Sequence, residues 1–403
     1  MFERFVRLPR TVWALGLVSL FMDVSSEMIH GLLPVFLVST LGASPALLGL
    51  IEGVAEATAS ITKVFSGWLS DRLGKRKLLT VAGYGLAALT KPVFPLAATP
   101  YEVLAARFAD RIGKGVRDAP RDALITDVAP KQMRGAAFGL RQSLDTIGAV
   151  VGPGLAIGLM ALMADDMRAV FGFAVIPAAA AVLLLIFGVK EPDGAAGAAA
   201  APAPIRWADV RGIGTAFWIA VAVGVLFTMA RFSEAFLVLR GSDAGLPLTL
   251  TPLVLIAMNV VYALVAAPAG GLSDRIGRRR LLAAGVVALI FADALLAWSG
   301  DLAGVMAGVA LWGLHMGLTQ GLLSALVADA APARLRGTAF GLFNLATGVT
   351  QLMASLAAGA IWARWGAPAT FMTGGGFALA SLIGVTALLK ARDPAPAAPK
   401  KGG

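Results

Sequence analysis

Cysteine is absent from this 403-residue chain, and histidine occurs only twice, as His30 and His315. The lack of cysteine excludes disulfide bonds and thiolate metal sites. Two histidines on distant segments disfavour a hydrolase, which needs a serine–histidine or metal constellation. Glu27-x-x-His30 resembles half of a carboxylate–histidine metal site, but no second copy exists. We therefore expect an interior, hydrogen-bonded His30 and no cofactor.

Charge is also scarce, since 14% of residues are charged and 58% are hydrophobic, with a mean hydropathy of +0.79. Soluble domains carry about a quarter charged residues, so this composition predicts a membrane protein. Apolar runs of about 20 residues can cross the hydrocarbon, where unsatisfied backbone groups require an α-helix. About twelve such runs are predicted by this criterion, at residues 12–38, 45–69, 78–98, 101–125, 136–162, 168–189, 212–239, 248–272, 281–299, 302–327, 338–363 and 369–390.

Two motifs recur half a chain apart. Segments 67–77 and 270–280 share the order Gly-x-x-x-Asp-Arg-x-Gly followed by basic residues, at a separation of 203 residues. Segments 122–140 and 324–342 match at a separation of 202 residues, with Arg134 aligned on Arg336. Because two unrelated motifs recur at almost the same separation, the sequence indicates that the chain arose by duplication of one half.

The predicted fold is an all-α membrane protein with twelve transmembrane helices in two pseudo-symmetric six-helix bundles. The N-terminal bundle covers residues 1–189, and the C-terminal bundle with a short disordered tail covers residues 212–403. Residues 190–211, rich in Ala, Gly and Pro, form the predicted cytoplasmic linker.

The net charge of +10 follows membrane topology and does not indicate a nucleic-acid partner. Most lysines and arginines lie in the N-terminus, the even-to-odd loops, the linker and the C-terminus, whereas the opposite loops hold Arg168, Arg240 and Arg364. Positive charge resists translocation, so both termini are predicted to be cytoplasmic, in a bacterial inner membrane. The expected partners are the lipid bilayer, a small-molecule substrate and protons, and we expect a monomer.

Polar side chains inside the predicted helices are the candidate functional residues, because intramembrane charge is costly and usually faces the bundle interior or water. The run 101–125 is the most polar and must line a cavity or be neutralised by neighbouring helices. Lys63 follows Glu52 and Glu56 on one stripe, where a structural ion pair is an equal alternative to a transport role. The candidates for the substrate site or its charge network are His30, Lys63, Arg107, Asp110, Arg111, Lys114, Arg141, Asp145, Arg231, Glu234, Trp312 and His315.

The repeated loop, the twelve predicted spans and the central linker together resemble the major facilitator superfamily over essentially the whole chain. The resemblance implies a cytoplasmic gate in which Asp71 caps a helix of the opposite half and Arg72 helps to latch it. It also implies that Arg107 occupies the position of the arginine that the family has in its fourth helix. The complete set implied for the gate is Gly67, Asp71, Arg72, Gly74, Asp274, Arg275, Gly277, Arg134 and Arg336.

Two further matches extend this resemblance. Gly148-x-x-x-Gly152-Pro153 is similar to the antiporter motif of proton-coupled drug exporters, although Ala156 stands where that motif has glycine. The segments 23–28 and 110–122 resemble a bacterial permease branch of the superfamily. The glycines also permit close helix packing, which would explain them without any transport role.

We predict a proton-coupled secondary active transporter that moves small organic molecules by alternating access. Export by antiport is favoured by the partial antiporter motif and the apolar second half, and a symporter for small organic anions is the alternative. A receptor or scaffold of the same fold without transport is a third hypothesis. Because desolvation favours a neutral carboxyl group, Glu27 is the predicted coupling residue, with Asp23, Glu52 and Glu56 as alternatives.

Overall fold

The computed structural model describes residues 8–73, 75–130, 133–190, 214–319, 322–323, 327 and 336–390, and every regular element among them is helical. The first half contains α2 (Arg10–His30), α3 (Leu33–Val35), η1 (Phe36–Thr40), α4 (Pro45–Leu73), α5 (Arg76–Thr90), α6 (Val93–Leu96), α7 (Pro100–Val128), α8 (Arg134–Leu162), α9 (Met167–Phe173) and α10 (Val175–Gly188). The second half contains α12 (Thr215–Ala230), α13 (Ala235–Asp243), η3 (Leu248–Leu250), α14 (Leu253–Ile276), α15 (Arg278–Trp298), α16 (Leu302–Thr319) and α18 (Arg336–Lys390). Most of the predicted linker and the predicted tail lie outside the described residues.

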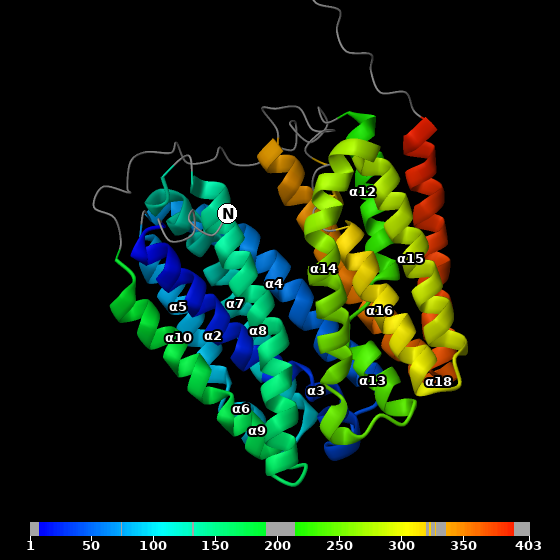
Figure 1. The fold of residues 1–403 in the computed structure, drawn as a ribbon, viewed down its shortest axis with the longest axis horizontal. Helices are drawn as coiled ribbons and strands as arrows, with labels where there is room; N and C mark the ends of the chain where they lie inside the picture. Colours follow the sequence, from blue (N-terminus) through cyan, green and yellow to red (C-terminus); the bar gives the residue numbers. More distant parts are fainter. Residues whose placement is uncertain are drawn as a thin grey trace, which may run out of the picture.

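The helices form two groups that follow the order of the chain (Figure 1). In the first group, α2 packs against α8 and α10, while α7 packs against α4 and α5. In the second group, α16 packs against α14 and α15, and α18 packs against α12 and α15. The internal symmetry expected from the repeated motifs stays a prediction.

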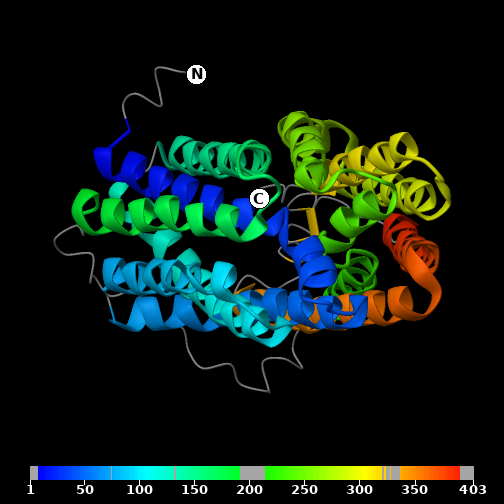
Figure 2. The same ribbon diagram turned by 90° about the horizontal axis from the view of Figure 1, so that it is seen from below.

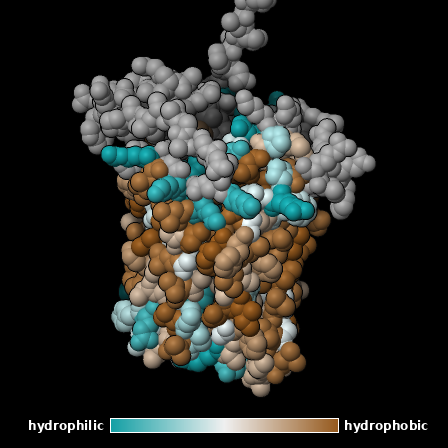
Figure 3. All heavy atoms as spheres, turned by 90° about the vertical axis from the view of Figure 1, so that its left-hand side faces the viewer, coloured by the Kyte–Doolittle hydropathy of each residue, from teal (hydrophilic) through white to brown (hydrophobic). Residues whose placement is uncertain are grey.

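Eight helical segments of the described part are long and apolar enough to cross a membrane. Segments α4, α5 and α7 are not among them, and α4 and α7 carry the charges singled out above. The face drawn in Figure 3 is hydrophobic across its middle, with hydrophilic side chains gathered toward its two ends. The chain is therefore a multi-pass membrane protein, while the count of twelve spans stays a prediction.

Several helices are interrupted. Pro92, which has no backbone N–H, predicts a kink in the run 78–98. The structure confirms it, since α5 ends at Thr90 and α6 resumes at Val93. The run 12–38 was expected as one helix, but the chain turns at residues 31–32, next to Pro34, which has no backbone N–H. Close to its middle, α18 contains Gly366 at a φ of 80°, which separates the two helices predicted there.

The run 212–239 is not one helix, which corrects the sequence prediction. Residues 231–234 are not helical, so Arg231 and Glu234 lie in a break between α12 and α13 rather than on one helical face. The Arg231 carbonyl accepts a hydrogen bond of 3.0 Å from Gln351 Nε2, and the Ala235 N–H donates to Ser233 Oγ at 3.2 Å. These bonds satisfy backbone groups that the break frees, as a membrane interior requires.

The two groups meet along α4 and α18, which lie side by side (Figure 2). A Cβ on Gly49 would lie 2.3 Å from the Ser355 carbonyl oxygen, and one on Gly359 would lie 2.4 Å from the Pro45 carbonyl oxygen. Further contacts join Gly31 to Pro252 and, by a side-chain hydrogen bond, Thr249 to Asp165. These described contacts hold the groups together at the end of the molecule opposite the start of α2 and the end of α18 (Figure 1).

Candidate functional site

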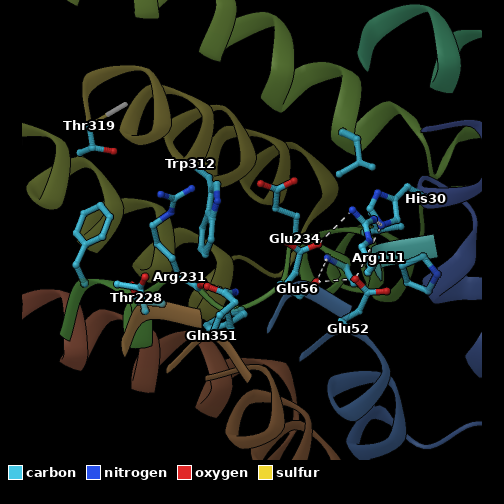
Figure 4. A pocket seen from close by; sticks show the side chains of 18 of the residues that line it. His30, Glu52, Glu56, Arg111, Thr228, Arg231, Glu234, Trp312, Thr319 and Gln351 are labelled. Carbon is cyan, nitrogen blue, oxygen red and sulfur yellow. Dashed lines mark hydrogen bonds and ion pairs between the residues drawn. The ribbon is translucent and has the colours of Figure 1, made fainter. Parts of the chain in front are cut away.

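A cavity of about 490 Å³ lies between the two groups of helices. Figure 4 shows its polar lining, with His30, Glu52, Glu56 and Arg111 on one side and Arg231 and Trp312 on the other. Ligand cavities in proteins typically have volumes of about 300–1,000 Å³, so this one suits a small organic molecule. Its lining comprises Glu27, His30, Pro34, Glu52, Glu56, Arg111, Lys114, Phe227, Thr228, Arg231, Phe232, Ser233, Glu234, Ala235, Val238, Leu255, Trp312, Thr319, Leu323, Phe343, Thr347 and Gln351.

Helix α7 supplies the cations of the first wall. It begins at a capping box in which Thr99 accepts the Glu102 N–H, and Pro100 occupies the first turn. The helix then buries Arg107, Asp110 and Arg111, so the predicted polar face points inward. Intramembrane charges require such an interior position, where carboxylates of neighbouring helices can compensate them.

The most enclosed ion pair joins α7 to α4. Arg107 Nη2 donates to both Glu52 oxygens at 2.7 and 2.6 Å, and each side chain is only 4% exposed. Ser233 Oγ of the second group donates to the same carboxylate at 3.3 Å. Glu52 therefore ties the two groups together, and its two oxygens already have donors.

Glu27 and His30 lie next to this pair. Arg111 Nη2 donates to His30 Nε2 at 3.0 Å, which confirms the interior hydrogen-bonded histidine. Glu27 lies 3.6 Å from His30 Nδ1, and its side chain is 23% exposed within the cavity lining. Glu56 lies 3.7 Å from Arg111 and is 36% exposed. Among the described residues, no group of three or more potential ligands could hold a metal ion.

The rest of the α7 face is neutralised away from the cavity. Lys91 Nζ donates to Asp110 at 2.9 Å and to Ser26 Oγ at 3.1 Å. The Arg117 guanidinium lies 4.4 Å from the centroid of the Tyr84 ring, and Arg121 donates to Tyr84 and to Ser19. No sequence pattern marked Tyr84 or Ser19, because hydroxyl groups are common in apolar helices.

Helix α8 brings its candidates to the side of α2. Arg141 Nη1 donates to Asp145 at 2.5 Å, and Arg141 Nε lies 3.8 Å from Asp122 of α7. A Cβ on Gly148 would lie 2.9 Å from Asp23 Cβ, and one on Gly152 would lie 2.8 Å from Glu27 Cβ. The two glycines of the antiporter-like segment therefore press directly on the α2 backbone at two of the predicted coupling residues.

The second wall is aromatic. Phe227, Phe232, Trp312 and Phe343 line it, and the Phe232 and Trp312 ring centroids lie 5.7 Å apart. From the sequence, Trp312 could have lined the cavity or packed between helices, and the structure places it in the cavity lining. His315, by contrast, is fully buried behind this wall, where its Nδ1 lies 2.8 Å from the Gly285 carbonyl oxygen.

The remaining candidates that the structure describes lie away from the cavity. Lys63 is exposed and does not line it, and Arg72 is exposed at the end of α4. Gly277 has a φ of 89° between α14 and α15, a conformation that favours glycine. Gly67 lies within α4 and Arg134 begins α8. Gly74 and the side chains of Asp71, Asp274, Arg275 and Arg336 lie outside the described residues.

Comparison with known proteins gives one consistent family. The family model described as Major Facilitator Superfamily matches residues 15–259 and 236–403. An uncharacterised MFS-type transporter of Methanocaldococcus jannaschii is 30% identical over 366 residues, which is 88% of this chain and 89% of that protein. The multidrug resistance protein MdtH of Aeromonas hydrophila is 30% identical over 152 residues, or 38% of each chain.

Solved structures show the same fold. A variant of the nucleoside transporter NupG aligns with a TM-score of 0.80 at 13% identity, covering 94% of this chain and all of that one. The human organic anion transporter MFSD10 aligns with a TM-score of 0.65 at 18% identity, covering 93% of this chain and 99% of that one. At these identities the likeness concerns the fold alone.

Proposed function

The chain belongs to the major facilitator superfamily and is therefore a secondary transporter, and from that premise we propose that it is a proton-coupled exporter of small amphipathic organic molecules. One observation carries this proposal. The cavity between the two helical groups has a charged wall on one side and an aromatic wall on the other. A molecule with an apolar body and a polar group would match both walls.

Alternating access is the proposed mechanism. The two groups would rock about the central cavity and expose it to one side of the membrane at a time. The described contacts at the end opposite the start of α2, such as Gly31 against Pro252, would separate in the alternate conformation. Export is supported by the antiporter-like Gly148–Pro153 segment and by the partial similarity to MdtH.

Glu27 is the proposed proton carrier because it lines the cavity without an arginine partner within ion-pair distance in the described part. Glu52 is the weakest alternative as proton carrier. Its protonation would have to displace Arg107 from an ion pair in which each side chain is only 4% exposed. Glu56 has Arg111 at 3.7 Å. Asp23 lies against Gly148 and does not line the cavity.

A proton-coupled symporter for small organic anions is the second candidate function. Arg111, Lys114 and Arg231 in the cavity lining support it, because each could attract an anionic substrate. The two functions differ in the direction of substrate movement relative to the proton.

The test uses everted membrane vesicles with an acid interior generated by respiration. Lipophilic cations, neutral drugs and organic acids are added in turn, and collapse of the pH gradient reports proton release in exchange for substrate. We expect at least one compound to release protons with the wild-type protein and not with Glu27→Gln. Glu102→Gln is the matched control, because Glu102 is exposed outside the cavity and glutamine preserves a capping box.

Unchanged coupling in Glu27→Gln would remove Glu27 from the proposed role. Silence across the whole panel would argue against export. Uptake of a carboxylate into right-side-out vesicles, driven by an inward proton gradient, would then establish the symporter.

A further inference from the structure

The aromatic wall contains buried nitrogen atoms that have no hydrogen-bond partner. Trp312 is 1% exposed, and neither its Nε1 nor Nε of Arg231 has an acceptor among the described residues. Buried N–H groups are normally satisfied, so each unpaired one needs an explanation. Both residues line the cavity, and Figure 4 shows them on the same side of it. A ligand with acceptor atoms would supply the missing hydrogen-bond partners.

The position of Arg231 is defined by its surroundings. Its guanidinium carbon lies 5.5 Å from the centroid of the Phe227 ring, and its carbonyl oxygen is held by Gln351. The break between α12 and α13 places it beside the cavity. Behind it, His315 donates through Nδ1 to Gly285 and packs its ring 5.3 Å from Phe227. The arginine is therefore supported by packed aromatic groups rather than by a carboxylate.

The charge of Arg231 is not balanced in the way that other buried cations are balanced. Each of three other buried cations forms an ion pair with a carboxylate: Arg107 with Glu52, Lys91 with Asp110, and Arg111 with Glu56. Within the described part of the chain, neither Arg231 nor Lys114 has a carboxylate within ion-pair distance, although Glu234 lines the same cavity. An intramembrane cation usually has an anionic partner, and a substrate could supply it.

We propose that Arg231 and Trp312 form an anion subsite that binds the carboxylate of an amphipathic substrate. The guanidinium forms a charge-assisted hydrogen bond, and the indole N–H donates to the same group. The apolar body of the substrate packs against Phe227, Phe232 and Phe343. This inference rests on the proposed transport of amphipathic molecules through the same cavity, and it assigns their polar group.

The test compares three probes that share one apolar body: naphthylacetate, naphthylacetamide and naphthylethylamine. Binding to the purified full-length protein in detergent is measured by isothermal titration calorimetry. We expect wild type to bind naphthylacetate at least about tenfold more tightly than the amide or the amine, because a hydrogen bond to a charged group is strong. Arg231→Gln should remove this preference, Arg231→Lys should keep part of it, and Trp312→Phe should weaken naphthylacetate binding several-fold.

Arg364→Gln is the matched control, since Arg364 also lies over an aromatic ring, 5.4 Å from Trp365, but at an exposed position outside the cavity. It should bind all three probes as wild type does. Equal affinity for the three probes, no binding of any of them, or loss of the preference in Lys114→Gln but not in Arg231→Gln would overturn the subsite. Carboxylate preference without proton release in vesicles would retain the subsite and contradict the proposed coupling.

Discussion

At the scale of single residues, the first group of helices contains two kinds of buried charge. Glu52 with Arg107 and Asp110 with Lys91 are enclosed pairs whose partners lie within 2.9 Å. Glu27 is more open, and within the described part of the chain its one ion-pair neighbour is His30, at 3.6 Å. Enclosed pairs contribute to structure, because removing one partner leaves an uncompensated charge, whereas an open carboxylate can exchange a proton with the cavity.

The Lys91–Asp110 pair gives a stability prediction. Asp110→Asn should lower the free energy of unfolding by about 3–5 kcal/mol, because Lys91 would stay buried without a counter-charge. The double variant Lys91→Met, Asp110→Leu should recover most of this loss, since it removes both charges. Thermal unfolding of purified protein in detergent measures both variants. Equal loss in the single and double variants would show that the pair has another essential role.

At the scale of helices, close packing depends on particular glycines. Gly152 of α8 has Glu27 Cβ and the Val24 carbonyl oxygen 2.8 Å from the position of a Cβ. Gly158 of the same helix has open space around that position. Small residues at helix interfaces let membrane helices approach closely, so only Gly152 should be sensitive to an added methyl group.

Gly152→Ala should therefore separate α8 from α2, with a loss of about 1–3 kcal/mol in stability from overpacking. Because the shift occurs at Glu27, we also expect slower substrate-dependent proton release in everted vesicles. Gly158→Ala is the control and should be neutral or slightly stabilising, since alanine favours a helix. Melting curves and the vesicle assay compare the two variants, and equal behaviour would contradict the packing argument.

At the scale of the whole molecule, the absence of native cysteine makes alternating access testable. The side chains of Asp165 and Thr249 are hydrogen bonded between the two groups at the end opposite the start of α2. Replacing both by cysteine introduces the only thiols of the chain. An oxidised pair would hold that end closed.

We expect the oxidised double variant to lose at least about 90% of its transport, because alternating access requires each end of the cavity to open in turn. Reduction should restore transport, and each single cysteine variant should be active under both conditions. Full transport by the oxidised variant, with the crosslink verified by mobility on a denaturing gel, would mean that this end need not open.

The sequence predicted where helices form and bend better than it predicted which side chains contact one another. The Lys91-Pro92 kink followed from proline chemistry, and the inward position of the α7 charges followed from the cost of charge in lipid. The break at residues 231–234 contains neither Gly nor Pro, so no local signal marked it. It depends on Gln351 and on Ser233, whose hydroxyl also reaches Glu52.

The sequence by itself determined that this is a helical multi-pass protein with charge concentrated in its first half, because hydropathy and helix length act locally along the chain. Tertiary structure alone decided that Glu52 pairs with Arg107, that Lys63 lies outside the cavity, and that Trp312 lines it while His315 does not. Pairing and cavity lining depend on how helices are rotated and packed against one another. That rotation is set by contacts between residues distant in sequence, such as Gly152 with Val24 and Gly49 with Ser355.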